Sequence, residues 1–303
     1  MDAAPTTWRF DAIGTVWEIV TDEPLDEAVR AEVGDVIETF DRTWSRFRRD
    51  STVGALARRA GALPAPPDAA PMLDAFSAMS DATDGAVNPL VGTTLERLGY
   101  DADYSLHDAR AERGDLPAPE GWRDILSWRD GRLRLREPAL IDVGALGKGR
   151  LVDPVLGVVE RQASGAVAVD AGGDLAVRGG PQRIGLEHPF DARRVIGVWE
   201  LTDAALCASA TNRRAWPGAD GASLHHVLDA RTGVPVRTIA ATWAVAVDAM
   251  TADAVATALF FDGGARLAHE WGAEWVRMTT DGRIEWSPGC RAELFVRADS
   301  VEG

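Results

Sequence analysis

The chain has 303 residues, of which 46% are hydrophobic and 26% are charged, a composition typical of a globular protein with enough length for one or two cores. Its net charge is −15 and its isoelectric point is about 4.8, which argues against nucleic acids and anionic membranes as partners, because both bind basic patches. No apolar run approaches the roughly 18 residues of a transmembrane segment.

The N-terminal residues MDAAPTTWRF contain neither a basic region nor an apolar segment, so no signal peptide is visible. We therefore expect a cytoplasmic protein, or an extracytoplasmic one whose targeting segment is missing from this sequence. The two cysteines, Cys207 and Cys290, lack the spacing of metal ligands and do not suggest a disulfide scaffold. A single bridge between them is an unsupported alternative.

The first part of the chain predicts paired strands followed by helices. Residues 8–20 are typical of two strands separated by a glycine break. Apolar residues recur at steps of three and four over 25–48, which predicts a helix. The next expected elements are a Pro- and Ala-rich loop, a helix and a second loop, at 60–67, 70–84 and 112–122.

The rest of the chain predicts short strands interspersed with helices. Asp130-Gly131 is a hairpin turn signal between expected strands at 125–129 and 132–136. The remaining expected elements are, in order, a strand at 140–143, a helix at 147–163, a strand at 166–170, further strands to about 202, a strand at 236–248, a helix at 251–261 and a hairpin of 274–278 with 282–286.

Together these elements lack a regular βαβ rhythm and therefore predict an α+β fold, with mixed or antiparallel sheets and packed helices. No clean linker divides the sequence. We expect residues 1–303 to form one unit with two interleaved lobes.

The basic residues single out one position. Thirty-one of the thirty-two are arginine, and the only lysine, Lys148, lies in the stretch DVGALGKG from Asp142 to Gly149. A compact ammonium suits a phosphate pocket beside a backbone turn better than a planar guanidinium does. The glycines precede an expected helix, whose first N–H groups can bind phosphate, although the stretch fits neither the Walker pattern nor a dinucleotide fingerprint. Codon bias with a single exception is the alternative.

Two other segments carry residues suited to chemistry. Asp253 and Thr257 are four apart on an expected helix and share one face, so their oxygens can serve as Mg²⁺ ligands. The alternative is an Asp that complements the helix dipole and a Thr that bonds to its own backbone. His226, with Asp229 nearby to orient it, is a candidate general base, or else part of a polar turn that ends at Gly233.

In this order, the segments resemble those of the ApbE family of flavin transferases along nearly the whole chain. The matching stretches are Ala12–Thr15, Ser45–Arg48, Thr83–Pro89, Asp142–Gly149, Gly172–Asp174, Ala208–Thr211, His226–Gly233 and Ala252–Thr257. Four positions depart from the family pattern, namely Ile13 for Met, Asn88 for Asp, Ala230 for Pro, and Ala210 where Gly or Ser is common. None of them removes an implied metal ligand or the implied base.

The resemblance implies a set of site residues. Mg²⁺ would be held by the Ala145 carbonyl, Asp253 and Thr257, and His226 would be the base. The residues implied to contact FAD are Ile13, Phe47, Gly85, Ala86, Val87, Asn88, Asp142, Lys148, His226 and Val227.

The resemblance also implies the activity, which is transfer of FMN from FAD to a Thr or Ser hydroxyl of an acceptor flavoprotein, with release of AMP. Phosphoryl transfer of this kind needs neutralised diphosphate charge and a deprotonated nucleophile held in line. The alternatives are an FAD pyrophosphatase, with water as the acceptor, and a non-catalytic FAD-binding protein.

Overall fold

The computed structural model describes residues 5–219, 221 and 223–295. At its centre is an eight-stranded sheet in which every neighbouring pair of strands is antiparallel. In spatial order its strands are β1 (Thr6–Ala12), β2 (Thr15–Thr21), β6 (Val167–Asp170), β7 (Asp174–Arg178), β10 (Ala205–Ala210), β15 (Ile239–Ala246), β16 (Glu274–Thr279) and β17 (Ile284–Trp286).

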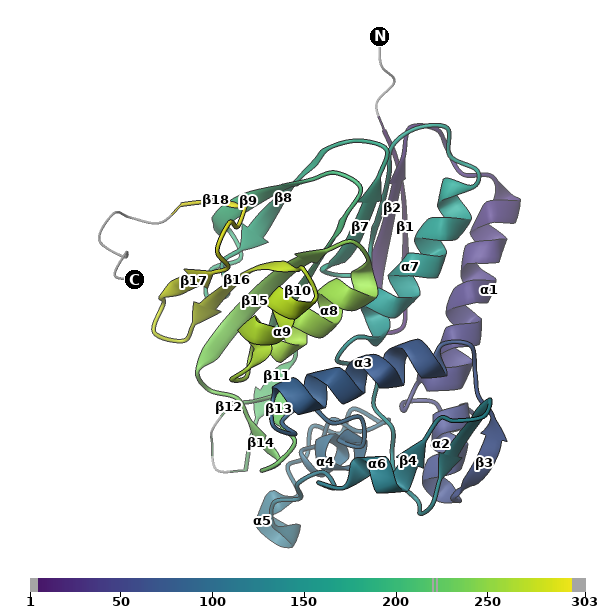
Figure 1. Ribbon diagram of the computed structural model, residues 1–303, viewed down its shortest axis with the longest axis vertical. Coiled ribbons are helices and arrows are strands. Elements are labelled where there is room, and N and C mark those ends of the chain that lie inside the picture. The colour runs from purple at the N-terminus through teal and green to yellow at the C-terminus, as the bar shows by residue number, and fades with distance from the viewer. Residues whose placement is uncertain (1–4, 220, 222, 296–303) are drawn as a thin grey trace.

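Both faces of this sheet are covered (Figure 1). One face packs against helices α1 (Glu27–Trp44), α7 (Gly147–Glu160), α8 (Ala249–Ala258) and α9 (Gly264–Glu270). The other face packs against a small sheet of β8 (Gln182–Glu187), β9 (Val195–Leu201) and β18 (Glu293–Leu294). Because it is covered on both sides, β15 is buried at every residue, which explains its almost uninterrupted apolar sequence.

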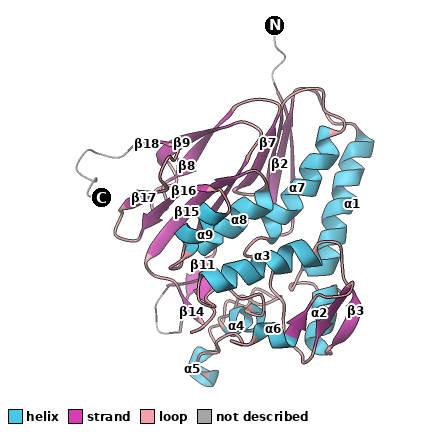
Figure 2. Ribbon diagram, viewed as in Figure 1, coloured by secondary structure: helices cyan, strands magenta, loops and turns pink. Residues whose placement is uncertain are grey.

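A second lobe is built from two separate stretches of chain, 52–143 and 215–235, and consists of short helices and strands (Figure 2). The chain thus leaves the sheet lobe and returns to it twice, as the prediction of interleaved lobes requires. Its elements are α2 (Thr52–Arg58), β3 (Gly61–Pro64), α3 (Ala69–Ala82), α4 (Gly92–Arg97), α5 (Arg110–Arg113), α6 (Trp122–Ile125), β4 (Leu126–Ser127), β5 (Arg132–Leu135), β11 (Ala215–Pro217), β12 (Ser223–His225), β13 (Leu228–Asp229) and β14 (Val234–Pro235).

The α+β prediction is confirmed, and local sequence signals explain the best-placed elements. Helix α1 begins after Asp26, whose carboxylate accepts the Val29 N–H at 2.8 Å, and the predicted apolar stripe is buried. Asp130 and Gly131 have φ of 54° and 65°, as the two-residue turn joining β4 to β5 requires. Both cysteines are free, and no helix of the described residues is both long and apolar enough to cross a membrane.

Two of the predicted elements are wrong. The expected loop at 60–67 contains strand β3, which pairs with β5 from Gly61 to Pro64. Pro64 lacks an N–H, so it signals a break in the sequence although it is tolerated in an edge strand. The expected strand at 140–143 pairs with no described strand, because the Asp142 N–H donates to the Pro89 carbonyl at 2.8 Å. Ile141 and Val143 are nevertheless buried in the core, which explains the strand-like apolar pattern.

Candidate functional site

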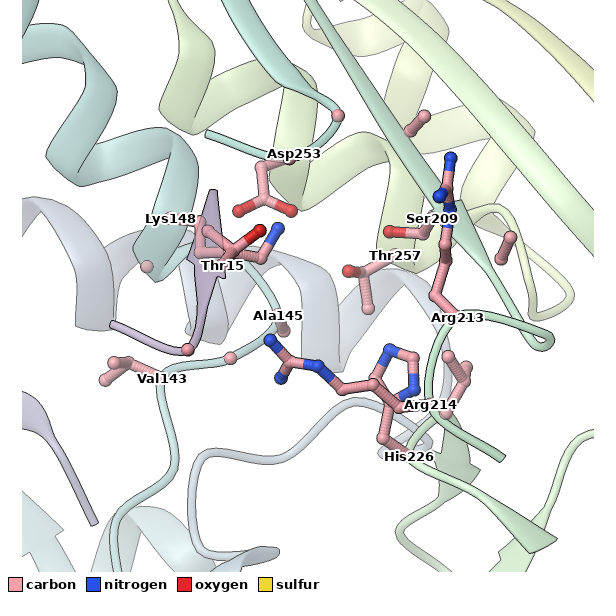
Figure 3. Close-up of a pocket in the computed structure, with 18 of the residues that line it drawn as sticks. Thr15, Val143, Ala145, Lys148, Ser209, Arg213, Arg214, His226, Asp253 and Thr257 are labelled. Atoms are coloured by element: carbon pink, nitrogen blue, oxygen red, sulfur yellow. The ribbon is translucent and has the colours of Figure 1, made fainter. Parts of the chain in front are cut away.

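A cavity of about 970 Å³ takes its walls from both lobes and is the candidate functional site (Figure 3). Its volume falls at the upper end of the roughly 300–1,000 Å³ typical of small-molecule sites. The walls include the β1–β2 turn, the first turn of α7, one face of α8, the end of β10 and the loop after β12. The polar side chains that Figure 3 labels around it are Thr15, Lys148, Ser209, Arg213, Arg214, His226, Asp253 and Thr257.

Helices α7 and α8 meet at Gly149, and this contact shapes one wall of the cavity. A Cβ atom at Gly149 would lie 2.1 Å from the Ala249 carbonyl oxygen, so only glycine allows this approach. The Gly149 N–H donates to the Asp253 carboxylate at 3.0 Å. The Asp153 carboxylate of α7 accepts two N–H groups at the start of α8, at 2.8 and 3.1 Å. These bonds fix Asp253 beside the first turn of α7, where Lys148 lies.

Lys148 lies between two buried carboxylates. Its ammonium contacts Asp174, which is 0% exposed and whose Oδ1 has no hydrogen-bond partner in the described part of the chain. Burial alone would lower the pKa of Lys148, but the charges of Asp174 and Asp253 outweigh it and raise the pKa. Burial and the neighbouring Asp174 raise the pKa of Asp253 to about 7. Two carboxylates therefore share one ammonium, and this wall favours an additional cation.

The β1–β2 turn reaches the cavity next to the paired glycines. Ile13 and Gly14 form the two turn residues, with φ of 45° and 72°, between the paired residues Ala12 and Thr15. A Cβ atom at Gly172 would lie 2.0 Å from the Thr15 hydroxyl oxygen. The glycine turn therefore brings bare backbone against Thr15, which faces the cavity together with Ile13.

His226 faces the cavity from the opposite wall and is half-buried. Burial lowers its pKa to about 3, and the positive charge of Arg214 contributes further. The ring is therefore neutral at neutral pH, with a nitrogen lone pair that can accept a proton. No described residue bonds to its buried Nδ1.

The expected partnership between His226 and Asp229 is wrong. The Asp229 carboxylate instead accepts hydrogen bonds from Arg231, the shortest from its guanidinium at 2.9 and 2.6 Å and one from its backbone N–H at 2.9 Å. The adjacent His225 is turned inward and its Nε2 lies 2.7 Å from the Val236 carbonyl oxygen. Of the two neighbouring histidines, only His226 lines the cavity.

Three residues with an oxygen suited to a hard cation line the same cavity, namely Ala145 with its backbone carbonyl, Asp253 with its carboxylate and Thr257 with its hydroxyl. No cluster of three or more His, Cys, Asp or Glu side chains suited to a metal exists in the described ranges. A cation here would thus have one carboxylate, and phosphate or water would complete its shell, which is a typical arrangement for Mg²⁺. The buried and unbonded Asp174 oxygen adds negative charge nearby, so the residues fit this ion.

Comparison with known proteins places this architecture in a family. The family model described as "ApbE family" matches residues 13–277, which spans nearly every wall of the cavity. The chain belongs to the ApbE family.

The named relatives share low sequence identity with this ApbE-family chain, but the matches cover most of its length. A Klebsiella pneumoniae protein named FAD:protein FMN transferase is 27% identical over 78% of this chain and 76% of its own length. A Rhodobacter capsulatus protein of the same name is 26% identical over 97% of this chain, which spans only 58% of that relative. A crystal structure of the ApbE protein of Thermotoga maritima superposes with a TM-score of 0.76, covering 94% of this chain and 98% of that one, at 23% identity. That likeness confirms the fold.

Nearly all of the residues expected from the sequence come together in this ApbE-family cavity. Gly85 is the exception, because it lies outside the lining, in the turn after α3, with φ of 82°. Asn88 lines the cavity, but its side chain bonds to the backbone of Pro119 and Leu90. The residues that do line the cavity are Ile13, Phe47, Ala86, Val87, Asn88, Asp142, Ala145, Lys148, His226, Val227, Asp253 and Thr257.

Several lining residues were missed by the sequence reasoning. Arg46 is buried, donates to Asp142 at 2.5 Å and to the Tyr100 carbonyl at 2.6 Å, and lies 4.1 Å over the Phe47 ring. Arg214 donates to the Tyr100 hydroxyl. Their partners are distant in the sequence, so no local spacing could have identified them.

Proposed function

We propose that this ApbE-family chain transfers FMN from FAD to a Thr or Ser hydroxyl of an acceptor flavoprotein and releases AMP. The observation that carries the proposal is the meeting, in one cavity, of a cation-attracting carboxylate wall and a neutral histidine. The named relatives carry the corresponding transferase name. Because the cavity takes residues from both lobes, we propose that the whole chain acts as one unit.

In this reaction the acceptor hydroxyl oxygen attacks the phosphorus of the FMN half of FAD. A new P–O bond forms, the bond to the bridging oxygen breaks, and AMP leaves with the electron pair of that bond. The hydroxyl proton passes to the neutral imidazole of His226. Burial keeps this ring unprotonated before the reaction starts, and the negative charge of a bound diphosphate would raise its pKa toward the range in which a general base is effective.

Lys148 and the proposed metal ligands would serve the diphosphate. Ala145, Asp253 and Thr257 would hold Mg²⁺, which when bound supplies charge neutralisation for the diphosphate. Lys148 lies on the same wall and is held in its charged form by Asp174. The remaining proposed FAD contacts are Ile13, Phe47, Ala86, Val87, Asn88, Asp142 and Val227, with Gly85 acting only through the turn that it forms.

The test uses the purified protein with FAD, Mg²⁺ and a candidate acceptor flavoprotein. We expect AMP release that depends on the acceptor, and an acceptor whose mass increases by one FMN less one water. AMP release that is equal with and without acceptor, with no mass increase, would instead identify a pyrophosphatase. Bound FAD with no AMP and no response to Mg²⁺ would identify a non-catalytic carrier.

A further inference from the structure

Arg214 differs from the other arginines that line the cavity. Arg46, Arg48 and Arg213 each pair with a carboxylate. For Arg214 no carboxylate of the described residues lies within 4.0 Å. Its guanidinium donates to the Tyr100 hydroxyl and lies 5.8 Å from the centre of that ring. It is therefore a cation whose charge is available to a ligand.

The surroundings hold Arg214 in place without neutralising it. Tyr100 is 5% exposed and stacks on the Trp216 ring, with ring centres 5.6 Å apart. The Tyr100 carbonyl accepts from Arg46, which is bonded in turn to Asp142. These contacts hold the Tyr100 hydroxyl in position to accept a hydrogen bond from Arg214. Because the hydroxyl is neutral, it does not offset the positive charge of the guanidinium.

The side chain of Arg214 points into the part of the cavity where the reaction would occur. In Figure 3 it extends past His226, with its guanidinium on the side of Ala145. Its charge contributes to lowering the pKa of His226, as expected for two groups that line the same cavity. Lys148 enters from the α7 wall, so the two cations approach from different elements.

The charges of the site leave a role for this cation. With Asp253 ionised, as a bound metal ion would require, Lys148 is outnumbered by Asp174 and Asp253, so this cluster has a net negative charge. One divalent cation would leave it with a single net positive charge, whereas a diphosphate carries two negative charges. Arg214 supplies the missing positive charge.

We propose that Arg214 is a phosphate-binding catalytic residue, which contacts the diphosphate of FAD and stabilises its charge as the bond to AMP breaks, and that Tyr100 is its positioning residue. This inference rests on the proposed function. No proton moves to or from Arg214 in the step, because its guanidinium remains charged throughout.

The experiment compares Arg214→Ala with Arg266→Ala, a matched change at an exposed arginine of α9, which pairs with Glu270 and lies outside the lining of the cavity. We expect Arg214→Ala to lower kcat for AMP release about 100-fold or more, as the loss of one preorganised donor does. Added guanidinium should restore part of that rate, and Arg214→Lys should retain part of it. Arg266→Ala should stay within about twofold of the wild type.

A binding measurement separates this inference from the proposed function. Calorimetry with ADP and Mg²⁺ should show at least about tenfold weaker binding for Arg214→Ala, and no such change for Arg266→Ala. This result is required even if the wild-type protein transfers no FMN. Equal ADP affinity of the two variants, or a lost rate that guanidinium does not restore, would overturn the assignment of Arg214.

The positioning role of Tyr100 has its own test. Tyr100→Phe removes the hydroxyl and keeps the ring, so it should lower kcat in the wild type and have little further effect in Arg214→Ala. Equal effects in both backgrounds would show that Tyr100 does not act through Arg214.

Discussion

Gly149 of α7 donates its backbone N–H to the carboxylate of Asp253 on α8, across 104 residues of sequence, at 3.0 Å. The bond joins a glycine that permits close helix packing to the carboxylate proposed as a metal ligand. The packing of α7 on α8 and the geometry of the site therefore depend on the same contact.

The first prediction concerns that contact. In Gly149→Ala the new methyl group would lie 2.1 Å from the Ala249 carbonyl oxygen, so the helices must separate. We expect the free energy of unfolding to fall by about 1–3 kcal/mol, measured by urea denaturation. Gly157→Ala on the same helix is the control, because its Cβ would meet nothing within 4 Å, and it should stabilise by about 0.4–1 kcal/mol. Similar behaviour of the two variants would refute the close-packing argument.

The second prediction concerns the proposed metal ligand. Asp253→Asn keeps the shape of the side chain but removes its charge. We expect Mg²⁺-dependent AMP release to fall at least about 100-fold, because losing even a residue that only hydrogen-bonds to a metal ligand lowers metal affinity or activity about 10- to 100-fold. The Asp253→Asn variant should still fold, but Mg²⁺ should no longer raise its melting temperature. Asp262→Asn, at an exposed position just after α8, should behave like the wild type. A full Mg²⁺ response in Asp253→Asn would remove this residue from the metal site.

The third prediction concerns the proposed base. His226→Ala should bind FAD with an affinity within about twofold of the wild type, while the rate of FMN transfer falls about 100- to 10,000-fold. Fluorescence of bound flavin reports the affinity, and acceptor mass reports the transfer. His107→Ala, at an exposed histidine paired with Glu112, controls for the loss of an imidazole elsewhere. Unchanged transfer in His226→Ala would exclude it from the mechanism.

The fourth prediction concerns pH. The pKa of His226 is about 3 in the fold, mainly through burial, against about 6.5 in an unfolded chain. The unfolded chain therefore binds more protons between these values, so stability is lost as pH falls below about 6.5 and continues to fall to about 3. His226→Gln should lose less stability over that range, which denaturant titrations at several pH values would measure. Identical pH profiles for the two proteins would contradict the depressed pKa.

The pH argument extends to the ligand-bound protein. Arg214 contributes to the low pKa of His226, so a bound anion that offsets this charge should raise it. NMR titration of the imidazole with and without ADP measures the shift. We also expect Arg214→Ala to raise the pKa of His226 in the absence of ADP, whereas Arg266→Ala leaves it unchanged.

Elements and site residues that depend on neighbours in sequence could be predicted. The spacing of Val29, Val33 and Ile37 identified α1, and the i, i+4 spacing of Asp253 and Thr257 placed both on one helix face. Strand β3 could not be predicted in this way, since its pairing with β5 forms 70 residues away and overrides the local signal of Pro64.

The polar contacts of the site could not be predicted from the sequence, for a similar reason. The contacts of Lys148 with Asp174, Arg46 with Asp142 and Arg214 with Tyr100 span 26, 96 and 114 residues. Such pairs follow from how α7, β7 and the second lobe pack, and no spacing along the chain indicates them. The expected pairing of His226 with Asp229 was wrong because Arg231, two residues from Asp229, competes for the same carboxylate.

The close helix contact at Gly149 also affects which metal ion the proposed site would accept. The carboxylate of Asp253 is tied to the backbone of α7, and Asp153 ties α7 to the beginning of α8, so this cradle has little freedom to expand. Calcium takes six to eight oxygens at about 2.3–2.6 Å from adaptable surroundings, whereas magnesium accepts a compact octahedron at about 2.0–2.1 Å. If Asp253 holds a metal ion as proposed, a cradle bonded in this way would discriminate by ionic radius and favour magnesium over calcium.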